Sequence, residues 1–134
     1  MIQQNTLIAQ LMNLLEGIAH NTQYPDYFND ERLLADHKTY FNLCKYIFPE
    51  LKEGFLAIEN SNLQPPDKLN HLLNILSEEL NIDLSKVNGS EILRYNIGHI
   101  HRFLVILYEY SKIINENANR KPIVRSESGS GDIR

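Results

Sequence analysis

Cysteine and tryptophan are almost missing from this sequence of 134 residues, which has one Cys, Cys44, and no Trp. A chain with one thiol cannot close an internal disulfide or build a thiolate zinc cluster by itself, so we expect a reducing, cytoplasmic location. Glycine is also sparse, at six residues, and β-branched runs between Gly turns, which a sandwich or barrel needs, do not occur. The predicted fold class is all-α.

Long apolar runs and known catalytic motifs are absent as well. Residues 1–5 lack the basic flank of a secretory signal, and the longest apolar run, 103–107, is far too short to span a bilayer. The sequence holds no phosphate-binding Gly-rich loop, no calcium loop and no His-Glu-x-x-His pair. We therefore predict no membrane partner, no cofactor and no enzymatic activity.

Positive charge is scarce in most of the chain. Residues 1–119 hold 9 Lys/Arg against 15 Asp/Glu, a net charge of −6, whereas residues 120–134 hold 4 against 2, a net charge of +2. A protein that binds a nucleic-acid duplex needs a basic face to neutralise phosphates. The acidic body argues against a nucleic-acid partner.

The apolar residues that are present, 43% of the chain, are enough for one core and recur at helical spacing. They predict one domain over 1–119 with four main helices, at about 2–19, from Asp30 or Asp36 to Phe48, at 67–81 and at 97–117. At its centre we expect Leu72, Leu76, Phe103, Leu104 and Leu107.

Between these helices the sequence predicts loops and short elements. Pro25 makes 21–29 a loop, the connector 53–64 is expected to hold at most a short turn of helix, and a brief helix at 91–95 is expected to be capped by Ser90. Residues 120–134 combine Pro, Gly, Ser and charge, which predicts a disordered tail or a linker.

Two segments carry a resemblance to a known family. The segment Ile92-Leu93-Arg94-Tyr95-Asn96, followed by Ile100 and Phe103-Leu104, lies where calponin-homology-like domains have an Ile/Leu pair, a Gly-Asn or Gly-Asp turn and a terminal helix. Upstream, Leu34-Ala35-Asp36 and Ile47-Phe48-Pro49 are similar to the family's Leu-x-Asp-Gly helix ending in Phe-Pro, with His37 in place of the Gly. The chain thus resembles the divergent calponin-homology-like domains of centrosomal, basal-body and ciliary coiled-coil proteins.

The resemblance implies a non-enzymatic interaction module at the cytoskeleton, centrosome or basal body of the cilium. Such a module binds microtubules or tubulin, or docks another centriolar component, and the residues after Asn117 would lead to a coiled coil. The alternative is a generic helical adaptor that recognises a partner helix through an apolar groove, without a cytoskeletal role. The sequence does not indicate an oligomeric state.

Candidate partner-binding residues follow from charge and from aromatic content. Lys38, Lys45 and Lys52 recur every seven residues and, with Arg32, form a candidate basic face for an acidic tubulin tail, although the acidic residues around them favour a plain solvated face. In the loop, Tyr24 and Tyr27 are the second candidates, because Tyr supplies rigid contact area at interfaces; anchoring of the loop to the core is the simpler interpretation.

Residues with catalytic or metal-binding side chains do not combine into a site. On a helix, His99 and His101 would diverge by roughly 200°, so they cannot share a tetrahedral ion. His37 and Cys44 would lie about 10 Å apart by helical rise, which is too far for a nucleophile and its base. We expect Cys44 to be a buried thiol, and we predict no catalytic and no metal-binding residue.

Overall fold

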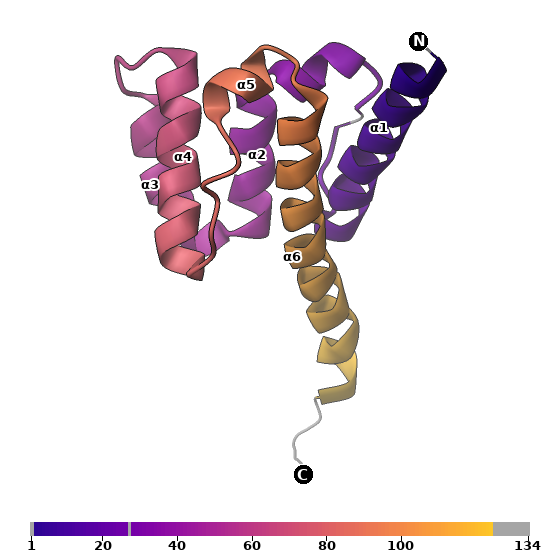
Figure 1. Ribbon diagram of the computed structural model, residues 1–134. Helices are drawn as coiled ribbons and strands as arrows, with labels where there is room; N and C mark the ends of the chain where they lie inside the picture. Colours follow the sequence, from indigo (N-terminus) through magenta and orange to yellow (C-terminus); the bar gives the residue numbers. More distant parts are fainter. Residues whose placement is uncertain (1, 27, 125–134) are drawn as a thin grey trace.

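The computed structural model describes residues 2–26 and 28–124, and over these ranges the protein is all-α, with no strand (Figure 1). Its helices, with 3-10 turns written η, are α1 (Ile2–Thr22), η1 (Glu31–Ala35), α2 (His37–Ile47), η2 (Pro49–Leu51), α3 (Lys52–Glu59), α4 (Pro65–Leu80), α5 (Gly89–Leu93) and α6 (Ile97–Val124). The all-α prediction is confirmed, and α1, α2, α4 and α6 correspond to the four predicted main helices.

One predicted helix start is confirmed, whereas the predicted connector and the predicted tail differ from the structure. Asp36 does begin a new helix, because its side chain accepts the Lys38 N–H at 3.0 Å and so caps α2. The connector forms the eight-residue helix α3, which is more than the single turn expected. At its far end, α6 continues past Asn117 to Val124, so residues 120–124 are helical and only 125–134 of the predicted tail lie outside the described residues.

The N-cap of α5 is Asn88 and not Ser90, which corrects the sequence-based prediction. The Asn88 side-chain oxygen accepts the N–H groups of Ser90 at 2.8 Å and Glu91 at 3.2 Å. Asn88 has extended backbone angles, which place its carbonyl at the start of the helix, whereas Ser90 is already inside the first turn. Asn and Ser cap equally well, so only the backbone conformation separates the two candidates.

The first and last helices lie side by side in parallel, and this is the most extensive helix pair of the fold (Figure 1). Asn21 Nδ2 donates to Ser111 Oγ at 3.1 Å, and Gly17 faces the ring of Tyr108. A Cβ on Gly17 would lie 2.8 Å from Tyr108 Cε1. The absent side chain therefore permits the close approach of α1 to α6.

The core is one cluster of buried side chains to which α1, α2, α4 and α6 contribute most of the residues. All five residues predicted for its centre are buried: Leu72, Leu76, Phe103, Leu104 and Leu107. The ring of Tyr40 stacks on Phe103 at a centroid distance of 5.2 Å, and its hydroxyl donates to the Leu34 carbonyl. The buried hydroxyl is thereby satisfied, and it fixes η1 against α2.

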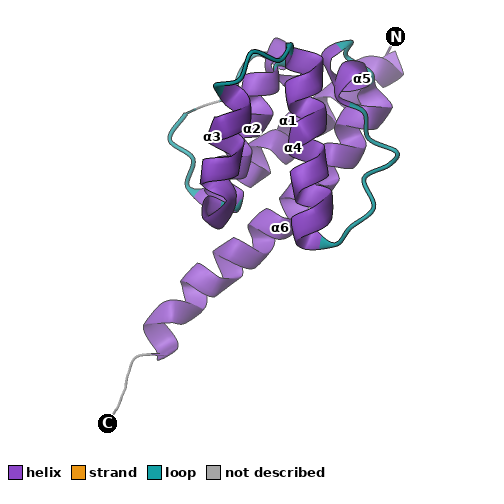
Figure 2. Ribbon diagram, turned by 90° about the vertical axis from the view of Figure 1, so that its left-hand side faces the viewer, coloured by secondary structure: helices purple, strands orange, loops and turns teal. Residues whose placement is uncertain are grey.

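The second half of α6 extends beyond the other helices, as the two views show (Figures 1 and 2). With 28 residues, α6 has a length of about 42 Å at 1.5 Å per residue, against about 24 Å for the 16 residues of α4. Its first turns therefore lie inside the bundle, and its last turns lie outside it.

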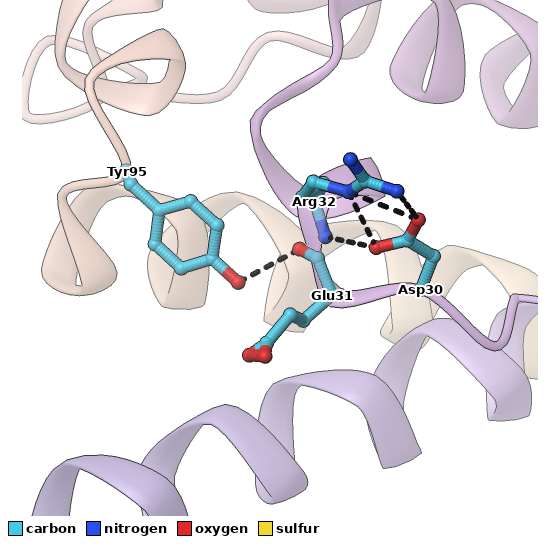
Figure 3. A network of polar contacts seen from close by, with 4 residues as sticks. All are labelled: Asp30, Glu31, Arg32 and Tyr95. Atoms are coloured by element: carbon cyan, nitrogen blue, oxygen red, sulfur yellow. Dashed lines mark hydrogen bonds and ion pairs between the residues drawn. The ribbon is translucent and has the colours of Figure 1, made fainter.

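The corner between α5 and α6 is held by Tyr95. This residue has a φ of 67°, a left-handed conformation that is uncommon for a bulky side chain. Its hydroxyl donates to the Glu31 carbonyl at 2.7 Å, which joins the corner to η1 across 64 positions of sequence (Figure 3). The contact offsets part of the cost of the backbone conformation and ties two distant segments together.

Candidate functional site

Arg32, the first of the predicted basic residues, lies in η1 with its charge engaged. Its Nη2 lies 2.7 Å from Asp30 Oδ2, and its Nε lies 3.1 Å from both carboxylate oxygens (Figure 3). The Arg32 hydrogen bonds lower the pKa of Asp30, so the pair stays ionised and its two charges offset each other. Arg32 thus presents little net positive charge to a partner.

Lys45 on α2 is also neutralised within the protein. Its Nζ lies 2.6 Å from Glu59 Oε1 on α3, and both side chains are about four-fifths buried, with exposed fractions of 19% and 21%. On the other side, Lys68 Nζ donates to the Glu59 carbonyl at 2.7 Å. The position of Lys45 supports the packing of α2 against α3.

The remaining two basic candidates, Lys38 and Lys52, are exposed. Neither forms an ion pair within the part of the chain that the structure describes. Lys38 lies in the first turn of α2 and Lys52 at the start of α3, so most of the length of α2 separates them along the chain. The four basic candidates therefore present two free charges, not four.

Tyr24 is half-buried, and aromatic neighbours hold it. Its ring stacks on Phe28 at 5.2 Å and meets Tyr46 edge-on at 4.9 Å. Burial, with a smaller contribution from the Asp26 carboxylate, raises the pKa of the Tyr24 hydroxyl. A hydrogen bond between this hydroxyl and the Asn42 side chain acts in the opposite direction. Tyr24 therefore anchors the loop 23–30 to α2, whereas Tyr27 lies outside the described residues.

A hollow of about 540 Å³ brings three of the six candidates together. We call it the tyrosine–lysine hollow, and it is lined by Tyr24, Pro25, Asp26, Asn42, Lys45, Tyr46, Pro49 and Lys52. Tyr24, Lys45 and Lys52 meet here because Pro49 ends α2 and turns the chain, which places the start of α3 next to the last turn of α2. Arg32 and Lys38 do not line this hollow.

A second hollow, of about 400 Å³, adjoins the first and is almost entirely apolar. This apolar hollow is lined by Tyr46, Ile47, Phe48, Pro49, Glu50, Leu80, Tyr110, Ile113 and Ile114. It shares Tyr46 and Pro49 with the tyrosine–lysine hollow. Two large apolar side chains on its wall are exposed, Tyr46 at 44% and Ile113 at 51%. We refer to the two adjoining hollows as the docking face.

Sequence reasoning missed a third hollow, of about 430 Å³, between α6 and the loop 81–88. We call it the α6 groove, and it is lined by Asp83, Lys86, Val87, His101, Arg102, Val105 and Ile106. Lys86 and Arg102 are 16 positions apart on different elements, so no spacing pattern in the sequence joins them. A search for cations within one helix period cannot find such a pair.

Groups that catalysis or metal binding would use are dispersed. Cys44 is fully buried, and burial raises the pKa of its thiol far above the ordinary range, which leaves it an unreactive thiol. His99 Nδ1 accepts the Asn88 N–H at 3.1 Å, as a structural contact, and His101 is exposed. Within residues 2–26 and 28–124, no three His, Cys, Asp or Glu side chains gather as metal ligands would.

Comparison with known proteins adds no relative. No protein-family model, no curated protein and no solved structure matches the chain. Along the described helices, none has both the length and the apolar character needed to cross a membrane.

Proposed function

We propose that this protein is a non-enzymatic interaction module that binds a protein partner on the docking face. The observation that carries the proposal is the continuity of the two hollows: an apolar hollow with exposed Ile113 adjoins, through Tyr46 and Pro49, a mixed hollow whose lining includes Lys45 and Lys52. An aromatic residue at the centre of an apolar patch with a polar rim is the usual anatomy of a protein interface.

The position of the hollow supports this role. The wall formed by Tyr110, Ile113 and Ile114 still borders the bundle, because Tyr110 and Ile114 pack against the core and the ring of Phe48 meets Tyr110 edge-on at 5.4 Å. A partner seated there would contact the end of α2 and this part of α6 at once. Contact with both elements would bury more apolar area than either offers alone.

In its more specific form, the proposal is a calponin-homology-like domain of a centrosomal or ciliary protein that binds microtubules, tubulin or another centriolar component. The support comes from the resemblance of the segments 34–49 and 92–104, and from the left-handed φ of Tyr95, which lies in the segment where the family has a Gly-containing turn. Of the basic candidates, Lys38 and Lys52 have charges available for an acidic polymer.

The alternative is an adaptor that binds an apolar partner helix without a cytoskeletal role. The apolar hollow favours it, because Ile47, Phe48, Leu80, Tyr110 and Ile114 supply aliphatic and aromatic walls with little charge. Helix-in-groove recognition relies on such walls and tolerates salt, whereas contact with an acidic polymer through lysines does not.

Co-sedimentation with microtubules tests the more specific form. We expect the wild type to pellet at low salt, and we expect Lys38→Glu/Lys52→Glu to reduce pelleting strongly, because it reverses the two free charges among the basic candidates, of which Lys52 lines the docking face. The matched control is Lys86→Glu/Arg102→Glu, which makes the same change in net charge at the α6 groove. Tyr46→Ala/Ile113→Ala tests the apolar hollow.

The outcomes separate the hypotheses. No pelleting of the wild type at low salt would refute microtubule binding and leave the adaptor. Loss of pelleting in the control variant alone would place the contact at the α6 groove and contradict the docking face. A protein-docking role of this face as a whole would be refuted if crosslinking from Tyr46 and Ile113 positions in cells captured no partner that wild-type protein competes away.

A further inference from the structure

The α6 groove holds two cations that the protein does not neutralise. Four of the basic residues in the described ranges form ion pairs, namely Arg32, Lys45, Arg94 and Lys112. Lys86 and Arg102 form none within those ranges, although the body carries a net charge of −6 over residues 1–119. Lys38, Lys52 and Lys68 form no ion pair in those ranges either, but Lys86 and Arg102 line the same hollow, so their two charges act on one ligand.

The Arg102 guanidinium is held in place by a backbone contact. Arg102 Nη1 donates to the Lys86 carbonyl at 3.3 Å, which ties α6 to the loop 81–88. Two residues further along, the Asn88 N–H donates to His99 Nδ1 at 3.1 Å and ties the end of this loop to the first turn of α6. A guanidinium fixed by one N–H keeps its other donors for a ligand.

One carboxylate lines the groove, and it has its own partners. Asp83 Oδ1 accepts the Ser85 N–H at 2.9 Å, and hydrogen bonds from Ser85 lower the pKa of Asp83, with a smaller contribution from the charge of Lys86. No oxygen of Asp83 lies within ion-pair distance of Lys86 or Arg102 among the described contacts. The lining therefore keeps a net positive charge.

Apolar side chains form the other part of the groove. Val87 is buried, with 8% of its surface exposed, and Val105 and Ile106 on α6 are half-buried. His101 lies exposed on the same helix and lines the groove beside them. The hollow thus combines aliphatic area with cations at one rim, a combination that inorganic anions do not need.

We propose that the α6 groove binds an acidic peptide segment of a partner protein. Carboxylates of the segment pair with Lys86 and Arg102, and an aliphatic side chain packs against Val87, Val105 and Ile106. Charge complementarity selects the occupant: an anionic segment is repelled by most of this acidic body and is attracted here. Two cations release too few counterions to hold a nucleic-acid duplex, so a peptide is the better fit. The site is distinct from the docking face and does not depend on it.

Fluorescence anisotropy with the full chain tests the proposal. The probe is a fluorescein-labelled peptide of Glu-Glu-Leu repeats, and the reference is the same peptide with Gln in place of Glu. We expect the Glu peptide to bind and the Gln peptide to bind at least about tenfold more weakly. Binding should weaken as the Debye length falls from about 10 Å at 0.1 M to about 3 Å at 1 M salt.

Two variants of equal charge locate the site. Lys86→Glu/Arg102→Glu should weaken binding of the Glu peptide at least about tenfold. Arg94→Glu/Lys112→Glu makes the same change in net charge at two surface ion pairs that line neither the α6 groove nor the docking face, and it should leave binding within about threefold. The first pair of residues is exposed, and circular dichroism checks that the fold is kept; Lys86→Gln/Arg102→Gln replaces it if the double reversal unfolds the protein.

Three results would overturn the proposal. Equal binding of the Glu and Gln peptides would show that the cations do not select the ligand. An equal loss in both charge variants would show that the effect comes from net charge and not from this groove. Tighter binding of a fluorescein-labelled single-stranded oligonucleotide than of the Glu peptide would assign the groove to nucleic acid instead.

Discussion

The two halves of α6 carry the same kinds of side chain in different surroundings. In the first half, Ile100, Phe103, Leu104 and Leu107 are completely buried, because α1, α2 and α5 surround them. In the second half, Ile113 is 51% exposed, and the last turns of this half extend beyond the other helices (Figure 1). An apolar stripe therefore predicts the helix and its inner side, but what covers the stripe depends on where the neighbouring helices end.

The largest effect on stability is expected from shortening a buried side chain in the first half of α6. Leu104→Ala should lower the free energy of unfolding by roughly 2–5 kcal/mol, because a cavity remains among rigid neighbours. Ile113→Ala is the matched substitution in the open half, and it should change stability by no more than about 0.5 kcal/mol. Urea denaturation followed by circular dichroism measures both.

Equal destabilisation by these two substitutions would contradict the contrast between the halves. A strong effect of Ile113→Ala alone would mean that a second molecule covers the apolar hollow during the measurement. Repeating the denaturation over a range of protein concentrations separates that case, since only an association makes the midpoint depend on concentration.

Two glycines extend the contrast between packed and open sites. A Cβ on Gly89 would lie 2.9 Å from Leu69 Cβ and 2.9 Å from the Pro66 carbonyl oxygen, atoms that cannot move alone. Gly89→Ala should therefore destabilise the protein by about 1–3 kcal/mol. On Gly54 in α3, a Cβ would make only an ordinary 3.5 Å contact with Ile75, so Gly54→Ala should stabilise by up to about 1 kcal/mol.

The melting temperatures of the two Ala variants give the test. We expect Gly89→Ala to lower the melting temperature and Gly54→Ala to raise it. A rise in melting temperature for Gly89→Ala would show that α5 moves away from α4 at little cost, and the close packing of this corner would then be wrong.

The smallest effect on stability is expected from the titration of His37, a half-buried residue at the start of α2. Burial lowers the pKa of His37, with the Asp36 carboxylate acting in the opposite direction. The unfolded chain then binds the proton more readily, so stability should fall as the pH drops below about 6.5, the ordinary value of an unfolded His. His37→Gln should reduce this dependence between pH 7 and pH 5.

The exposed His101 supplies the matched variant for this measurement. Chemical denaturation at several pH values compares His37→Gln with His101→Gln. An equal change in the pH dependence from both would show that burial of His37 makes no difference to its titration.

Much of the fold was predictable, because helical periodicity and proline positions are local. The inner sides of α4 and α6, the new start at Asp36 and the burial of Cys44 all follow from near neighbours in the sequence. The cap of α5 and the far end of α6 did not. Asn88 and Ser90 are chemically equivalent caps, and the continuation of α6 to Val124 passes through residues whose composition predicts no helix.

The candidate site was predictable only in part, because charge in a sequence does not show which charges are paired. Spacing brought Lys45 and Lys52 to attention, and they do line one hollow, but Lys45 is neutralised by Glu59 from another helix. The free pair, Lys86 and Arg102, comes from two elements that meet only in the folded chain. Which charged side chains of different elements pair depends on the tertiary structure, and the spacing of residues along one sequence does not show it.

The side-by-side packing of α1 and α6 has a consequence for synthesis on the ribosome. Leu11, Leu15 and Ile18 of α1 are buried in the folded protein, and their cover includes α6, which is made after the other described helices. At about 5–20 residues per second, roughly 4–18 s pass between the emergence of α1 and that of Ser111. During that interval the apolar side of α1 is open to water and to chaperones, so the nascent chain, more than the finished protein, is the form that needs protection.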